Sequence, residues 1–282
     1  MKYKLIILDI DGTLNNRLHA VSKQNLQAIE EARKEGVIVT LATGRSFGNM
    51  RHVVQKTKVN HPVVTNDGAF IVSPQTEEVF FEKRIPREAT VGIIDLFEKN
   101  RIRYMLHLDT YSLLNRKMNY AFFIKRLKWR AFFVGLNEKN SMVVKPHLDI
   151  KEQMGRKYNL PLKMSIMANE LSPEKIEELR KRVVDRYGEV ISLSYSGSGN
   201  FEVLPFGISK GHGIDFYADY YGFSPKEIVA IGDNYNDREM LQKAGLGIAM
   251  GNAGDDLKEI ADQVTKSNEK NGVAHAIRKW VL

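Results

Sequence analysis

The sequence predicts an α/β protein built on a parallel β-sheet, with an α+β unit inserted between the two parts of the α/β domain. Short apolar runs alternate with amphipathic stretches in the first third of the chain and again in its last part. That alternation is typical of parallel strands joined by crossover helices. It is lost over residues 84–193. We therefore expect residues 1–83 and 194–282 to form one domain and residues 84–193 to form the inserted unit.

The first third contains three predicted strands and two predicted helices. Each strand is an apolar run rich in β-branched residues, as expected for strands that are buried on both faces. Ser22 can cap the first turn of the first helix, and Gly36 can end that helix. In chain order, the elements are strand 4–8, helix 22–35, strand 37–42, helix 46–58 and strand 62–65.

The middle of the chain mixes strands and helices in another order, which is why we assign it to an α+β unit. Its clearest helix begins at Ser172, a capping residue that is followed by Pro173 and Glu174 in the first turn. In chain order, the elements are helix 89–99, strand-like segment 103–114, a weakly patterned region to 161, strand 163–168, helix 173–187, strand 190–195, turn 196–200 and strand 201–204.

The last part of the chain returns to the pattern of the first. Ser224 and Glu227 have the spacing of a capping box, which favours a helical turn ahead of an apolar strand. In chain order, the elements are helix 211–221, strand 228–231, short helix 236–243, strand 246–250 and closing helix 273–281.

Composition excludes several classes of protein. The chain has 282 residues, of which 43% are hydrophobic and 27% charged, as in ordinary soluble globular proteins. It has no cysteine, so no disulfide framework or thiol nucleophile is possible. No apolar stretch approaches the roughly 18 residues of a membrane span, and the apolar run near the start is too short for a signal peptide. We expect a cytoplasmic protein that does not bind membranes.

The formal net charge is +8, and it is unevenly distributed. Residues 84–194 hold 22 Lys plus Arg and 13 Asp plus Glu, a net charge of +9. The remaining residues hold 20 and 21, a net charge of −1. The excess therefore belongs to the inserted unit, where it favours electrostatic guidance of an anionic small molecule over a general nucleic-acid surface.

Four polar motifs lie at the ends of predicted elements. They occupy residues 9–13, 43–45, 209–211 and 232–237. Three of them follow apolar strands, and ligands of open α/β sheets bind outside the carboxyl ends of the strands. The motif at 209–211 instead precedes a helix. We expect the four motifs to form one site.

The acids of these motifs favour a magnesium site. A single aspartate after a strand is more often a turn or cap residue, but Asp9, Asp11 and Asp233 come from adjoining strand ends. Gly12 permits a tight turn that spreads the first two carboxylates around one point. Several carboxylates at such a place need a cation, and oxygen ligands suit Mg²⁺. A calcium-binding EF-hand is excluded, because its glycine stands further from the first aspartate.

The remaining motifs favour phosphate binding. Thr43 and Gly44 stand where a strand precedes a helix, so that backbone N–H groups and a hydroxyl can hold a phosphate oxygen. Lys210 adds a positive charge ahead of another helix. Each of these features is common by itself, since most lysines are simply exposed. Combined with acids that bind a metal, they are the parts that phosphoryl transfer needs.

The motifs LDIDGTL, TGR, SKG and GDNYND match, in order and spacing, the four motifs of the haloacid dehalogenase (HAD) superfamily of phosphatases. The inserted unit resembles the cap of the Cof-type phosphatases, subfamily IIB. This resemblance implies a Rossmann-like three-layer core with a parallel sheet and an α+β cap domain of type C2B, which would close over the core and select the substrate. The subfamily usually has Asn-Gly-Ala after the third strand, whereas residues 66–69 here are Asn-Asp-Gly-Ala.

The resemblance also implies roles for single residues. Asp9 would be the nucleophile that forms an aspartyl-phosphate, and Asp11 would protonate the leaving alcohol and then activate water. Asp9, Asp233 and the backbone carbonyl of Asp11 would hold Mg²⁺. Asp237 and Asn234 would position these groups without contacting the substrate or the metal themselves. Asp237 would align Lys210 or the waters on the metal. The phosphoryl oxygens would contact the backbone of Ile10, Thr43, Gly44, Lys210 and Asn236.

The expected activity is that of a phosphoric monoester hydrolase acting on a small phosphorylated metabolite, such as a sugar phosphate or a phosphorylated cofactor. A phosphomutase with the same aspartyl-phosphate is an alternative that the sequence does not separate from a phosphatase. A dehalogenase is disfavoured, because it would not need Asp11 or the metal-binding acids. The sequence carries no signal for oligomeric state.

A basic and aromatic segment, residues 116–130, is the main feature outside the motifs. It holds six basic residues, four aromatic residues and no acid. Such a segment can bind single-stranded nucleic acid or lie on a membrane surface, and some of its residues could line the substrate cleft. We favour a cap surface whose aromatic residues pack inward and whose charges are solvated, because long basic side chains readily cover apolar surface. No nucleic-acid partner is therefore expected.

Overall fold

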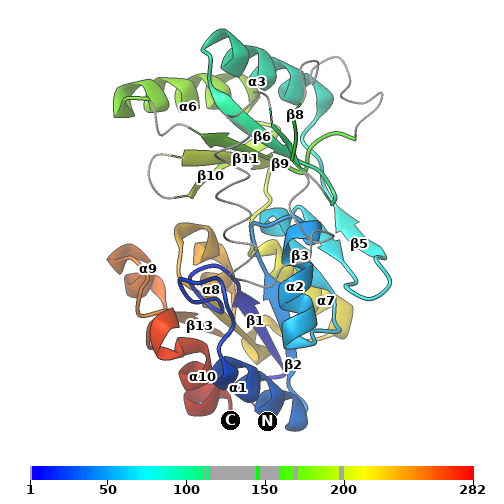
Figure 1. Cartoon of the computed structure of the whole chain (residues 1–282), viewed down its shortest axis with the longest axis vertical. Coiled ribbons are helices and arrows are strands. Elements are labelled where there is room, and N and C mark those ends of the chain that lie inside the picture. Colours follow the sequence, from blue (N-terminus) through cyan, green and yellow to red (C-terminus); the bar gives the residue numbers. More distant parts are fainter. Residues whose placement is uncertain (1, 111, 115–143, 147–158, 168–170, 197–199) are drawn as a thin grey trace. The chain divides into compact units, whose positions relative to one another are not determined.

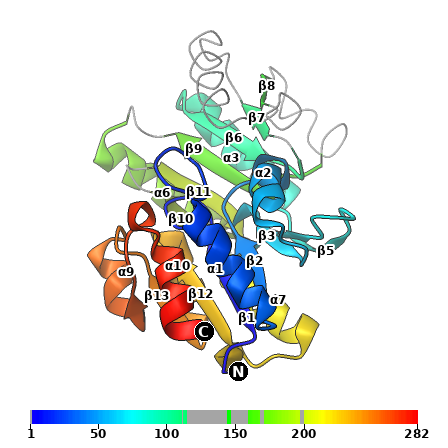
Figure 2. The same ribbon diagram turned by 60° about the horizontal axis from the view of Figure 1, so that its bottom comes forward.

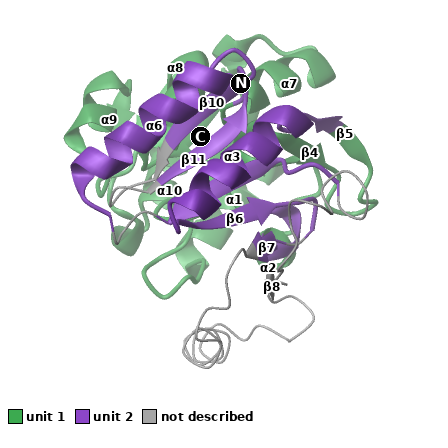
Figure 3. Cartoon of the chain, turned by 90° about the horizontal axis from the view of Figure 1, so that it is seen from above, with its two compact units in different colours: residues 1–45, 50–80, 209–282 green, residues 46–49, 81–208 purple. Residues whose placement is uncertain are grey.

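The computed structural model of the chain describes residues 2–110, 112–114, 144–146, 159–167, 171–196 and 200–282. Its contacts divide the chain into two compact units, shown in different colours in Figure 3. Unit 1 comprises Met1–Arg45, Met50–Phe80 and Ser209–Leu282, and unit 2 comprises Ser46–Asn49 and Phe81–Ile208. The basic and aromatic segment 116–130 lies outside the described residues, as does the centre of the expected turn 196–200.

An eight-stranded sheet carries the first and last parts of the chain (Figure 1). Its strand order is β14-β13-β12-β1-β2-β3-β4-β5. The pairs from β14 to β3 are parallel, and β3 pairs with β4 antiparallel. The strands are β1 Leu5–Asp9, β2 Ile38–Ala42, β3 Val63–Thr65, β4 Phe70–Val72, β5 Val79–Glu82, β12 Ile228–Gly232, β13 Leu246–Ala249 and β14 Gln263–Val264. The predicted α/β class with a parallel sheet is confirmed.

The two central strands of this sheet form its core. All five residues of β1 and all five of β12 are buried. Leu5 pairs with Ile228 on one side and with Ile38 on the other. Strands with neighbours on both edges and side chains covered on both faces need continuous apolar sequence, which explains the run before Asp9.

Helices connect the strands and cover the sheet. The helix α1, capped by Ser22, lies beside α10 in both views, on one face of the sheet (Figure 2). The helices of this part are α1 Lys23–Lys34, α2 Phe47–Thr57, α7 His212–Tyr221, α8 Arg238–Lys243, α9 Asp255–Ile260 and α10 Gly272–Ala276. Shorter helical turns are η1 Asn66–Gly68, η3 Pro225–Glu227, η4 Tyr235–Asp237, η5 Asn268–Lys270 and η6 Ile277–Val281.

Unit 2 is an α+β unit, as the sequence predicts. Its six-stranded sheet has the order β10-β11-β9-β6-β7-β8 and is antiparallel except for the pair β7–β8. Its strands are β6 Arg103–His107, β7 Ser112–Leu114, β8 Val144–Pro146, β9 Lys163–Met167, β10 Ile191–Ser196 and β11 Asn200–Pro205. Two helices, α3 Arg87–Lys99 and α6 Pro173–Tyr187, pack on this sheet through one apolar cluster.

The structure differs from the sequence interpretation in several elements. Residues 194–208 belong to unit 2, because β11 pairs along its length with β10, whereas the sequence assigned residues from 194 onward to the core. The expected helix 236–243 is a 3₁₀ turn, η4, followed by α8. The expected closing helix 273–281 divides into α10 and a π-helical turn, η6. The sequence did not predict β4, β5, α9 or β14.

None of the helices that the structure describes is long and apolar enough to cross a membrane.

Candidate active site

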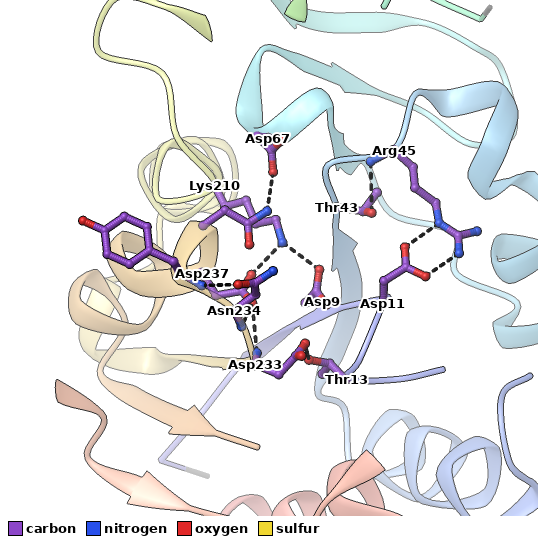
Figure 4. A network of polar contacts seen from close by, with 12 residues as sticks. Asp9, Asp11, Thr13, Thr43, Arg45, Asp67, Lys210, Asp233, Asn234 and Asp237 are labelled. Carbon is purple, nitrogen blue, oxygen red and sulfur yellow. Dashed lines mark hydrogen bonds and ion pairs between the residues drawn. The ribbon is translucent and has the colours of Figure 1, made fainter. Parts of the chain in front are cut away.

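Three strand ends bring the acidic motifs together at one edge of the sheet. Asp9 is the last residue of β1 and pairs with Ala42, which Thr43 follows. Asp233 follows Gly232, the last residue of β12, on the other side of β1. Because these strands are parallel, their carboxyl ends meet at this edge. Figure 4 shows the side chains that gather there.

Lys210 is the centre of the polar network. It precedes α7, and its side chain is 2% exposed. Its Nζ donates to Oδ1 of Asp9 at 2.7 Å and to Oδ1 of Asp237 at 2.6 Å. Burial alone would lower the pKa of Lys210, but the carboxylates of Asp237, Asp9 and Asp67 outweigh it and raise that pKa. The ammonium therefore stays charged between its two acids.

The acids around Lys210 carry more negative charge than one ammonium can balance. Burial raises the pKa of Asp9 well above its ordinary value, although Lys210 acts in the opposite direction. Burial and the neighbouring Asp237 raise the pKa of Asp233 to about 6, although a hydrogen bond from Thr13 opposes them. Both shifts express the cost of holding carboxylates close together away from water. A bound cation would relieve that cost.

The donor set fits a hard divalent cation. One carboxylate oxygen each from Asp9, Asp233 and Asp237 lies within 4.8 Å of the others. Both oxygens of Asp237 already accept hydrogen bonds, Oδ1 from Lys210 and Oδ2 from the backbone N–H groups of Asp233 and Asn234 at 2.9 and 3.0 Å. Asp237 therefore organises the site by holding Lys210 and two backbone N–H groups, and it lies in the same group of carboxylates as Asp9 and Asp233. Carboxylate oxygens are the ligands that Mg²⁺ takes.

The turn after β1 holds Asp233 against Asp9. Gly12 has a φ of +86°, and a Cβ atom there would lie 2.1 Å from Oδ2 of Asp233. The next residue, Thr13, donates from Oγ1 to Oδ1 of Asp233 at 2.8 Å. Asn252, after β13, donates to the carbonyl of Gly12 at 2.9 Å. The glycine is therefore required both by its backbone conformation and by the close approach of the acid.

Asp11 is turned away from Lys210 and toward Arg45 (Figure 4). Arg45 donates to it from two nitrogens, with Nε 2.6 Å from Oδ2, and His19 Nδ1 lies 3.7 Å from Oδ1. Burial acts to raise the pKa of Asp11, but the hydrogen bonds from His19 and Arg45 outweigh burial and lower it. Asp11 is therefore ionised in this structure.

The predicted phosphate-binding residues surround the same edge. Thr43 Oγ1 accepts the backbone N–H of Arg45 at 3.2 Å, in the loop that Gly44 shares. The carbonyl of Ile10 accepts the backbone N–H of Asn15 at 2.8 Å. Asn236 donates from Nδ2 to Oδ1 of Asp67 at 2.8 Å.

Asn234 has a local role in this structure. Its Oδ1 accepts the backbone N–H of Tyr235 at 2.8 Å and so caps η4, while its own backbone N–H is held by Asp237. The structure thus gathers Asp9, Asp233, Asp237 and Lys210 in one network. Asn236 is bonded to Asp67, whose charge acts on Lys210. The side chains of Asp11 and Asn234 have other partners.

Among the described residues, those that contact the site but were not singled out from the sequence include Thr13, His19, Arg45, Asp67 and Asn252. Thr13 and Arg45 belong to the recognised motifs, and Asp67 is the extra acid of the segment 66–69. Asn252 could have been predicted as a site residue, because it comes shortly after β13 and ligands bind outside the carboxyl ends of parallel strands.

Comparison with known proteins gives a family and close relatives along the whole chain. A model of the haloacid dehalogenase-like hydrolases matches residues 6–277. The 5-amino-6-(5-phospho-D-ribitylamino)uracil phosphatase YcsE of Bacillus subtilis is 31% identical over 284 residues, which cover 99% of this chain and 96% of the relative. Phosphatase YwpJ of the same organism is 29% identical and covers 98% of this chain and 99% of the relative.

Solved structures share the fold over its full length. A haloacid dehalogenase-like hydrolase from B. subtilis has a TM-score of 0.82 at 26% identity, covering 99% of this chain and 100% of that one. A haloacid dehalogenase-like hydrolase from Bacteroides thetaiotaomicron has a TM-score of 0.81 at 25% identity, with 99% of both chains covered.

Proposed function

The chain belongs to the haloacid dehalogenase-like hydrolase family, and from that membership we propose that it hydrolyses a phosphomonoester of a small metabolite through an aspartyl-phosphate on Asp9. One observation carries the proposal. The carboxylate of Asp9 is buried, is paired with Lys210 at 2.7 Å, and has an oxygen within 4.8 Å of oxygens of Asp233 and Asp237. A nucleophilic acid beside a lysine and a cation site suits attack on an anionic phosphate.

The reaction has two steps on this chain. In the first, an oxygen of Asp9 forms a bond to phosphorus while the bond to the leaving alcohol breaks, and Asp11 donates a proton to that alcohol. In the second, water attacks the same phosphorus, Asp11 takes a proton from the water, and Asp9 leaves as a carboxylate. The ionised Asp11 beside Arg45 is in the form that the second step needs. It must take up a proton before the first.

Mg²⁺ is the proposed metal, held by Asp9, Asp233 and the backbone carbonyl of Asp11. When bound, it would supply positive charge that lowers the repulsion between the Asp9 carboxylate and the phosphate dianion. Lys210 acts in the same direction from the protein side. Asp237 keeps Lys210 charged and directed toward Asp9. Asn234 caps the turn that carries Asp237.

The proposed partners of the phosphoryl oxygens lie at the same edge of the sheet. The backbone of Ile10, together with Thr43, Gly44, Lys210 and Asn236, would donate hydrogen bonds to them. Donors that are fixed in place before the reaction stabilise the charge of the transition state without reorganising.

The proposed substrate is a small phosphorylated metabolite, either a sugar phosphate or a phosphorylated cofactor precursor. Relatives named 5-amino-6-(5-phospho-D-ribitylamino)uracil phosphatase, with 31% and 29% identity, support that class of compound. The inserted segment 84–193, with its net positive charge, is the proposed source of selectivity among such esters.

The test is release of inorganic phosphate from p-nitrophenyl phosphate in the presence of Mg²⁺. Asp9→Asn should lower kcat by at least roughly a thousandfold, because the nucleophile is lost, while the protein stays folded as judged by circular dichroism. A chelator should silence the wild-type enzyme, and added Mg²⁺ should restore it. Asp215→Asn, at an exposed acid paired with Lys243, is the control and should keep full activity.

Two results would contradict the proposal. Turnover by Asp9→Asn at the wild-type rate would exclude Asp9 as nucleophile, and activity untouched by the chelator would exclude the metal. Measuring inorganic phosphate also separates hydrolysis from return of the phosphoryl group to the substrate, as in a mutase.

A further inference from the structure

Residues 66–68 form a strained turn next to the active-site network. Asn66, Asp67 and Gly68 have positive φ angles of 49°, 54° and 99°. For residues with a Cβ atom this conformation is uncommon, and such strain is concentrated at functional sites. The backbone is fixed to the neighbouring loop, because the N–H groups of Asn66 and Asp67 donate to the carbonyls of Arg45 and Thr43 at 2.9 and 3.1 Å.

The turn itself does not require an acid. Asp67 is 1% exposed, and burying a carboxylate is costly. Glycine and asparagine adopt the left-handed conformation without adding a charge. The presence of a carboxylate at this place therefore points to a partner outside the turn.

That partner is the amide of Asn236. Asp67 Oδ1 accepts from Asn236 Nδ2 at 2.8 Å, and Figure 4 shows the carboxylate of Asp67 directed into the network around Lys210. A carboxylate only accepts hydrogen bonds, so the NH₂ end of the amide has to face it. Asn236 Oδ1 is buried and has no hydrogen-bond partner. The amide is thus held in one orientation despite an unpaired oxygen.

An amide held in this way has a defined donor. Its Nδ2 carries two N–H groups, and the contact with Asp67 uses one of them. The second then has a fixed direction. An asparagine facing another amide could instead bind in either of two orientations, only one of which presents this donor.

We propose that Asp67 is a positioning residue, which orients the amide of Asn236 so that its second N–H donates to the phosphoryl group of the substrate. The inference rests on the proposed phosphatase function and deepens it. Asp67 acts on Asn236 and does not itself contact the substrate.

A purely electrostatic role for Asp67 would have the opposite effect on phosphate binding. Asp67 is one of three acids whose charge acts on Lys210. If its charge were the main effect, removing it would strengthen the binding of inorganic phosphate, because one repulsion would be lost. If it positions Asn236, removing it weakens that binding. The inhibition constant of inorganic phosphate therefore separates the two roles by its direction of change.

The test uses Asp67→Asn, which keeps a residue that tolerates the left-handed backbone. With p-nitrophenyl phosphate, kcat/KM should fall about tenfold, the usual scale for loss of a charged hydrogen bond, and the inhibition constant of phosphate should rise. Asn236→Ala should give a similar fall, and the double variant should fall no further than Asn236→Ala alone. Asp262→Asn removes another carboxylate of unit 1, one that accepts from Gly247, and should leave both constants unchanged.

Several results would overturn the positioning role: tighter phosphate binding by Asp67→Asn, or losses in the two single variants that add in the double variant. Asp67→Gly relieves the φ strain and should reproduce the kinetic loss; wild-type constants in that variant would likewise overturn it. If Asp9→Asn is inactive while Asp67→Asn keeps wild-type kcat/KM, only the positioning role fails. If Asp9→Asn keeps wild-type turnover, the phosphatase proposal itself fails.

Discussion

Lys210 balances the negative charge of two buried acids. It is the ammonium that contacts both Asp9 and Asp237, and all three side chains are at most 5% exposed. Removing one partner from a buried ion pair leaves the remaining charge neither solvated nor paired, which is far more costly than losing an exposed pair. The contacts that pair Lys210 with Asp9 and Asp237 therefore also stabilise the fold.

We predict that Lys210→Met lowers the free energy of unfolding by about 3–5 kcal/mol at neutral pH without divalent cations. Asp9, whose pKa is already raised by burial, and Asp237 would then be buried carboxylates without this counter-charge. Their penalty is present above the unfolded pKa of a carboxyl group and is relieved as falling pH protonates them, so the difference from wild type should shrink toward low pH. Urea unfolding followed by circular dichroism measures both effects.

Lys243→Met is the matched control, since Lys243 pairs with Asp215 on the surface. Its loss should stay within about 1 kcal/mol, as for other exposed pairs. Equal losses of unfolding free energy in the two variants would show that burial does not increase the stabilisation from the ion pairs of Lys210.

The sequence predicts the meeting of Asp9 and Asp233 because the carboxyl ends of parallel strands lie at one edge of the sheet. Lys210 precedes a helix, and its place in the site was expected from the family resemblance. The sequence does not predict where a side chain turns within that edge. Asp11 faces Arg45 because the loop after β2 brings a guanidinium next to it. The burial of Asp67 depends on a left-handed turn that no periodic pattern of residues indicates.

The turn after β1 shows how an element boundary shapes the site. Gly12 and Gly36 both have positive φ angles, of 86° and 82°. A Cβ atom at Gly12 would collide with Asp233, whereas at Gly36 it would meet nothing within 4 Å. The two glycines therefore share a backbone requirement and differ in their surroundings.

We predict that Gly36→Ala costs roughly 1 kcal/mol of stability and leaves catalysis intact, since only the backbone is strained. Gly12→Ala should add to that cost, displace Asp233, and lower phosphatase activity while raising the Mg²⁺ concentration needed for half-maximal rate. Chemical unfolding and a magnesium titration of the rate provide the comparison. Equal Mg²⁺ dependence in the two variants would argue against a close fit between Gly12 and Asp233.

Helices that begin with a recognisable capping residue are predicted well from the sequence. The caps Ser22 and Ser172 and the box of Ser224 and Glu227 all form as expected. The missed strands β4 and β14 have three and two residues, too few for an alternating pattern to be recognised. Their existence depends on neighbouring strands that offer hydrogen bonds, which is a property of the sheet and not of the segment.

The distribution of charge is a property of the whole molecule. Residues 84–194 carry a net charge of +9 and the remainder −1. A field of this kind raises the encounter rate with an anionic ester and is screened by salt.

We predict that neutralising two exposed lysines of unit 2, Lys99→Gln with Lys181→Gln, lowers kcat/KM about twofold at low ionic strength and leaves it unchanged at high salt. The control is Lys34→Gln in unit 1, which should have no salt-dependent effect. Steady-state rates with a dianionic ester across a salt series make the measurement. The same difference at every salt concentration would show that the charge does not guide the substrate.

The order of strands in the core has a consequence for biosynthesis. β1 pairs with β12, so that Leu5 lies opposite Ile228. During translation, β1 can pair with β2 early, but its other edge lacks β12 until residues 228–232 have left the ribosome, whereas most of unit 2 is one continuous segment, Phe81–Ile208. Chains fold in units as they emerge, and pairings between distant segments form slowly. Because Asp233 and Asp237 follow β12, a nascent chain completes its candidate active site only at a late stage of synthesis.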